Sequence, residues 1–100
     1  HEYLHMFLGA LKVMNFDTYN KVIGMVSNTE YFNTMKQLMS NNFRYSNLAD
    51  SDLNEEVFVK ILSKHLTKET DSSIDKSLHN AASLIERTLF PKSDLGSNVL

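Results

Sequence analysis

The sequence predicts an all-α protein of about five helices. Only three Gly and one Pro interrupt its 100 residues. Apolar side chains recur at spacings of three and four, whereas the two-residue alternation typical of strands is hard to find. A chain of this length is enough for one domain with a modest core. We therefore expect a single helical domain over residues 1–100, with residues 92–100 as a tail or linker.

The first two helices follow from two apolar stripes. The first helix is predicted over residues 2–14, and its stripe is Leu4, Phe7, Leu8 and Leu11. A polar break at residues 15–17 follows, and Asp17 is expected to cap the second helix because a carboxylate accepts hydrogen bonds from free backbone N–H groups. The stripe of the second helix is Tyr19, Val22, Ile23 and Val26.

A third helix is predicted after the boundary at residues 27–29. Its expected core positions are Tyr31, Phe32, Met35, Leu38 and Met39. Residues 40–52 are rich in Asn, Ser and Asp and are predicted to form a loop that ends in a helix cap. Ser51 or Asp52 is the expected cap, with Glu55 or Glu56 in the first turn, where carboxylates favour the helix dipole.

The fourth and fifth helices complete the predicted fold. The fourth has the stripe Val57, Phe58, Ile61, Leu62 and Leu66. A polar link over residues 67–73 separates it from the fifth, whose stripe is Ile74, Leu78, Ala82, Ile85 and Leu89. Pro91 should end the last helix, because proline lacks the N–H that a helix interior requires.

Composition excludes several classes of protein. The net charge is -2 with both signs interspersed, so we expect no nucleic-acid partner. The chain has no Cys, so any metal must be held by His and carboxylate ligands. No apolar run approaches the length of a membrane span, and no signal-peptide pattern opens the chain. We expect a soluble protein of unknown location, and a secreted or virion-associated setting would suit a toxin-type or phage-type parent protein.

Residues His1 to His5 read HEYLH, which is an HExxH pattern. On a helix, His1 and His5 lie one turn apart on the same face, so both imidazoles can bind one metal ion while Glu2 projects beside them. Zinc in hydrolases uses such ligands and keeps one position for water, and a nearby carboxylate can take a proton from that water. The motif predicts a Zn²⁺ cofactor and a hydrolytic reaction.

Two imidazoles need a third ligand. Leu8 and Leu11 occupy the positions where the longer metzincin pattern would require Gly and His, so that completion is excluded. His65 and His79 are distant candidates, but each is expected to be an ordinary boundary or surface histidine. The carboxylates of the stretch Asn54 to Phe58, which reads NEEVF, fit better.

The pairing of HEYLH with NEEVF resembles the gluzincin metallopeptidases, of the thermolysin-like and anthrax lethal factor-like kinds. In that family a later helix supplies a Glu as the third zinc ligand, near an Asn and two residues before a Phe. The resemblance implies Glu56 as this ligand, with Phe58 after it. Glu55 is a close competitor, and Glu30, which precedes Phe32 in the same way, ranks third. Glu30 also suits the start of a helix.

The resemblance further implies a peptide or protein substrate and the architecture of a helical C-terminal lobe. The sheet that binds substrate in this family is not visible in the sequence. We therefore expect the rest of the parent polypeptide to lie upstream. In the expected mechanism His1, His5 and Glu56 bind zinc and Glu2 is the general base. Tyr45 is a weak candidate for a second donor to the oxyanion, and packing of its ring beneath a loop is the favoured explanation of this residue.

Two other functions stay open. The stretch Phe43 to Leu48, followed by Glu55 to Phe58, faintly resembles the middle of an FF domain, a helical module that binds phosphorylated or acidic peptides. The Pro and Trp usual in that family are missing from the matching positions. The other alternative is a degenerate peptidase fold that serves as a scaffold and binds no zinc. Metal analysis separates both from a peptidase.

Overall fold

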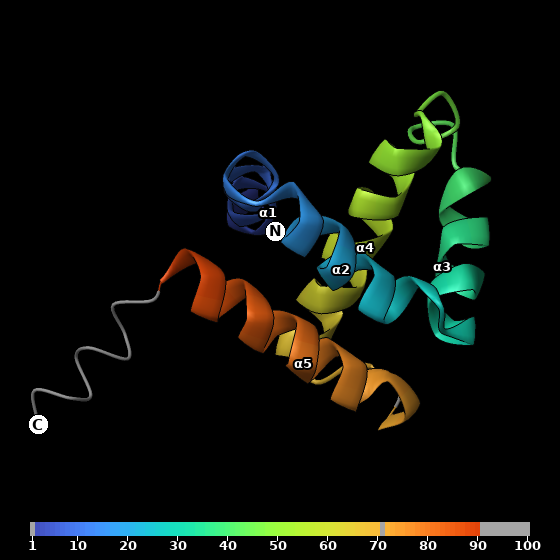
Figure 1. Cartoon of the computed structure of the whole chain (residues 1–100). Coiled ribbons are helices and arrows are strands. Elements are labelled where there is room, and N and C mark those ends of the chain that lie inside the picture. Colours follow the sequence, from blue (N-terminus) through green and yellow to red (C-terminus); the bar gives the residue numbers. More distant parts are fainter. Residues whose placement is uncertain (1, 71, 91–100) are drawn as a thin grey trace, which may run out of the picture.

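Helix α4 (Asp50–Leu66) is the central helix of the fold. In the computed structural model, this helix buries side chains on most of its circumference and contacts each of the other four helices (Figure 1). The structure describes residues 2–70 and 72–90, without the side chain of Glu2. A helix that is apolar on several faces gains most when neighbours surround it, which explains the central place of α4.

The remaining elements are also helices. They are α1 (Glu2–Met14), α2 (Phe16–Ser27), α3 (Glu30–Ser40) and α5 (Ser72–Leu89). No strand occurs in residues 2–70 and 72–90. The prediction of an all-α fold with about five helices is therefore confirmed, and α5 ends at Leu89 as expected from the proline that follows.

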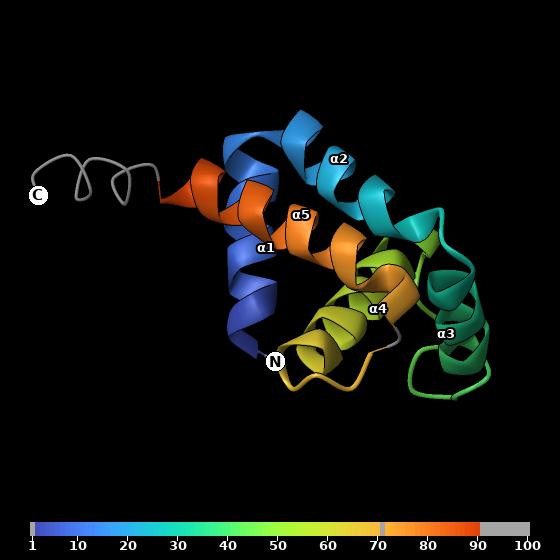
Figure 2. The same cartoon turned by 90° about the horizontal axis from the view of Figure 1, so that it is seen from below.

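Two pairs of helices pack closely side by side. Helix α2 lies beside α5, and α3 lies beside the first half of α4 (Figures 1 and 2). Helix α1 packs against both α2 and α5 and also reaches α4. This last contact brings α1, which contains His5, to α4, which contains the NEEVF segment.

Two predicted caps are wrong. Asn15, not Asp17, caps α2, and its Oδ1 accepts a hydrogen bond from the backbone N–H of Thr18 at 3.1 Å. Asp17 lies in the first turn, where its charge still favours the helix dipole. Helix α4 begins at Asp50, before the predicted caps Ser51 and Asp52, and its start has no side-chain cap.

Lys68, two residues after the end of α4, has a left-handed backbone conformation with φ of 60°. The backbone N–H of Glu69 then donates to the carbonyl oxygen of Lys64 at 2.8 Å. This bond pattern closes many helices and occupies a carbonyl that the helix itself leaves free. It turns the chain sharply, so that α5 runs back across the bundle (Figure 2).

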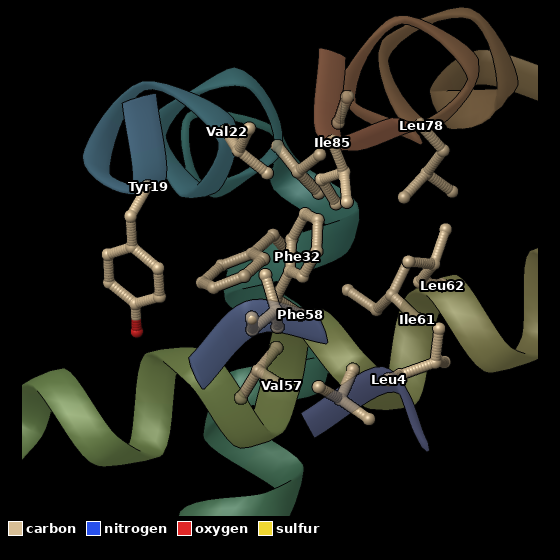
Figure 3. Close-up of a cluster of buried hydrophobic side chains, with 14 of the residues drawn as sticks. Leu4, Tyr19, Val22, Phe32, Val57, Phe58, Ile61, Leu62, Leu78 and Ile85 are labelled. Atoms are coloured by element: carbon tan, nitrogen blue, oxygen red, sulfur yellow. The ribbon is translucent and has the colours of Figure 1, made fainter. Parts of the chain in front are cut away.

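The core follows the predicted stripes with two exceptions. Phe32 and Phe58 lie at its centre, and both are almost completely buried (Figure 3). Leu38 and Leu66 are exposed by 63% and 55%, so their predicted core positions are wrong. Helix α3 contacts mainly α4, and only the face with Phe32 and Met39 meets it. The other buried members are Leu4, Leu8, Leu11, Tyr19, Val22, Val26, Leu53, Val57, Val59, Ile61, Leu62, Ile74, Leu78, Ala81 and Ile85.

Within the described residues, no helix is both long enough and apolar enough to cross a membrane. The predicted tail, residues 92–100, lies outside the described residues.

Candidate metal centre

His5 lies between two carboxylates of the NEEVF segment. Its Nδ1 is 3.0 Å from Oε2 of Glu55, and its Nε2 is 3.0 Å from Oε2 of Glu56. The three side chains are between one fifth and one third exposed. The structure therefore brings one His of the predicted motif together with both of the favoured candidates for the third ligand.

The arrangement follows from where α1 and α4 meet. Leu4 and Leu8 bury one face of α1 in the core, and His5 lies at the edge of that face. Glu55 and Glu56 are consecutive on α4, so their side chains leave the helix about 100° apart. An imidazole has nitrogens on two different edges, and His5 can meet both diverging carboxylates at once.

Tyr19 holds the second oxygen of Glu55. Its hydroxyl donates a hydrogen bond of 2.6 Å to Oε1 of Glu55, while Oε2 of the same carboxylate faces His5. The Tyr19 ring is 7% exposed and stacks on Phe16, and Nζ of Lys12 lies 5.4 Å from the centre of the ring. His5 of α1, Tyr19 of α2 and Glu55 of α4 thus form one connected set of polar contacts.

Burial raises the pKa of Tyr19 well above its ordinary value, and the hydrogen bond to Glu55 and the negative charges of Glu55 and Asp52 raise it further. The neutral phenol is therefore strongly favoured in the folded protein. As a neutral group Tyr19 remains a hydrogen-bond donor to Glu55.

This raised pKa predicts a loss of stability in alkaline solution. The unfolded chain releases the phenol proton from about pH 10 upward, whereas the folded protein keeps it. The contribution of Tyr19 is complete below pH 10. Above that pH the free energy of unfolding should fall by up to about 1.4 kcal/mol per pH unit. Urea unfolding from pH 8 to 11 measures this slope. Tyr19→Phe should flatten it, and an identical slope in that variant would contradict the assignment.

The three side chains do not yet form a three-ligand metal site. Glu55 and Glu56 contact different nitrogens of the ring, so their oxygens do not converge on one point with His5. Among the described residues no group of three or more His, Asp or Glu side chains is arranged to hold a metal ion. His1 and the side chain of Glu2 lie outside the described residues, so their predicted roles remain predictions.

The other candidates lie elsewhere. Glu30 is exposed in the first turn of α3, which Thr29 caps. Tyr45, in the segment between α3 and α4, packs its side chain against the core. His65 is half-buried near Asp75, with its Nδ1 3.2 Å from Oδ1, and His79 is exposed on α5. The oxyanion role of Tyr45 remains a prediction.

Tyr19 is the participant that the sequence analysis missed. Its place in an apolar stripe indicated a core residue, and it is indeed buried. A buried Tyr usually needs a hydrogen-bond partner for its hydroxyl, so its predicted burial indicated that a polar partner lies nearby. The sequence could not show that this partner is Glu55.

An apolar cavity of about 160 Å³ lies between α1, α4 and α5. Glu86 is the only charged residue in its lining, which is otherwise formed by Leu, Phe, Ile and Ala side chains. Its lining has no set of metal ligands and no nucleophile. We therefore place the candidate site at His5 and not in this cavity.

Comparisons of the chain with protein-family models, with curated proteins and with solved structures found no match.

Proposed function

We propose that this protein is a zinc-dependent peptidase of the gluzincin type, in which His1, His5 and Glu56 bind the metal. The observation that carries the proposal is the contact between His5 of HEYLH and Glu56 of NEEVF, at 3.0 Å through Nε2. The sequence suggested that these two motifs belong to one site. Their meeting in the folded chain supports that interpretation.

The distance between the two side chains suits zinc. Ligand nitrogen and oxygen atoms lie about 2.0–2.2 Å from zinc in a tetrahedral site, so two ligand atoms are separated by about 3.3 Å. The observed separation of 3.0 Å differs from this by only a few tenths of an ångström. The separation of these two atoms is therefore close to the spacing that two ligands of one zinc ion require.

In the proposed reaction, zinc and the side chains of the protein have different roles. A zinc ion held by His1, His5 and Glu56 would supply Lewis-acid chemistry, lowering the pKa of a bound water molecule and polarising the substrate carbonyl. Glu2 takes a proton from the attacking water and passes it to the leaving amine. Tyr45 is the proposed additional donor to the oxyanion. The substrate of the proposed reaction is a peptide or protein.

Metal analysis tests the proposal. Protein purified without chelators and supplied with Zn²⁺ should retain about one zinc per chain. His5→Ala should lose this zinc, because it removes the nitrogen that faces Glu56. The matched control is His79→Ala, which removes an exposed imidazole on α5 and should leave the zinc content unchanged.

The same experiment separates the alternatives. An FF-like interaction module or a zinc-free scaffold would bind no stoichiometric zinc while remaining folded, which circular dichroism verifies. Equal zinc content in His5→Ala and in the unsubstituted protein would also contradict the proposed site.

A further inference from the structure

We propose that Glu55 and Tyr19 are positioning residues for the metal centre, and that Glu55 is not itself a ligand. This inference rests on the proposed zinc site. It assigns a role to Tyr19, which lies outside both motifs, and a role other than metal ligation to Glu55 of NEEVF. It also distinguishes Glu55 from Glu56, which the sequence leaves as competitors.

The first step concerns the imidazole of His5. A histidine that binds a metal through one nitrogen usually donates the N–H of its other nitrogen to a carboxylate or carbonyl group. Glu55 lies 3.0 Å from Nδ1, on the opposite edge of the ring from Glu56. With its hydrogen held on Nδ1, His5 presents the lone pair of Nε2 toward Glu56. In the proposed site Nε2 and Glu56 would hold zinc, and Glu55 would fix the tautomer of His5.

The second step concerns what holds Glu55. A partly exposed Glu side chain has several rotamers, and a single contact to His5 would restrict it weakly. The hydroxyl of Tyr19 occupies the other carboxylate oxygen at 2.6 Å. Tyr19 is buried, and its ring is fixed by stacking on Phe16. Glu55 is therefore held at both oxygens, and the orientation of the His5 ring is linked to the core of the protein.

Zinc affinity distinguishes a ligand from a positioning residue. In a titration of each protein with Zn²⁺ against a competing chelator, Glu56→Ala should show no stoichiometric zinc. Glu55→Ala should still bind one zinc, with an affinity lowered about 10–100-fold, the usual effect of losing such a partner. Tyr19→Phe, which removes only the hydroxyl, should weaken binding toward the lower end of that range. Glu55→Gln keeps an acceptor for the Nδ1 hydrogen and should restore much of the affinity.

A second readout follows the tautomer directly. In zinc-loaded protein, the ¹⁵N NMR signals of His5 should show a hydrogen on Nδ1, and Glu55→Ala should broaden or shift that signal. Tyr31→Phe is the matched control, because it removes the hydroxyl of a half-buried Tyr on α3. It should change neither the affinity nor the His5 signals.

The two proposals fail in different ways. If the unsubstituted protein binds no zinc, the proposed function is overturned, and this inference is overturned with it. If the unsubstituted protein binds zinc and both Glu55→Ala and Tyr19→Phe bind it equally well, only the positioning role is overturned. Complete loss of zinc in Glu55→Ala with retention in Glu56→Ala would exchange the assignments and overturn the inference.

Discussion

Replacing Phe58 with alanine is expected to lower the free energy of unfolding by about 3–5 kcal/mol. Phe58 is fully buried on the central helix and lies beside Phe32 in the middle of the core (Figure 3). Truncating its ring removes buried apolar surface and leaves a cavity that the surrounding helices cannot fill completely. Urea unfolding followed by circular dichroism measures the change.

Phe43→Ala is the matched control for this experiment. Phe43 is 89% exposed in the segment between α3 and α4. Its removal should change the free energy of unfolding by no more than about 0.5 kcal/mol, as is usual for surface positions. Equal effects of the two substitutions would contradict the core packing described above.

The second large effect is expected in catalysis. Glu2→Gln removes the proposed general base but keeps the size and polarity of the side chain. Hydrolysis of an unfolded protein substrate should fall by about 10²–10⁴-fold, the range contributed by general acid–base catalysis. Zinc content should not change, because the proposed ligands remain.

Glu30→Gln is the informative control for Glu2→Gln. Glu30 was the third-ranked ligand candidate, and it lies exposed at the start of α3. Its substitution should leave both zinc content and hydrolysis unchanged. Full activity of Glu2→Gln would rule out the general-base role. Loss of zinc in Glu30→Gln would instead return Glu30 to the ligand set.

The helices were predictable because apolar periodicity reflects burial on one face. The errors arose where periodicity carries no information. Asn15 and Asp17 are both good caps, and the choice between them depends on the backbone at the break after α1. Leu38 continues the apolar spacing of α3, but it is about 100° around the helix from Met39 and misses the contact with α4.

The candidate site was predictable only in part. Two short motifs identified His5 and the pair Glu55 and Glu56, because each motif has a recognisable chemical pattern. The order of the contacts around the imidazole could not be predicted, since it depends on how α1 crosses α4. Tyr19 was hidden for the same reason, because its hydroxyl meets Glu55 only after α2 has packed.

The meeting of α1 and α4 at His5 links ligand occupancy to global folding. His5 and Glu55 are 50 residues apart in the chain, so an unfolded molecule rarely presents both motifs to one ion. Any ion or small molecule that requires both helices binds the native state selectively. By mass action, a ligand present at 100 times its Kd would add about 2.7 kcal/mol to the stability of the native state. Thermal unfolding with and without Zn²⁺ would thus report occupancy of this site without a substrate.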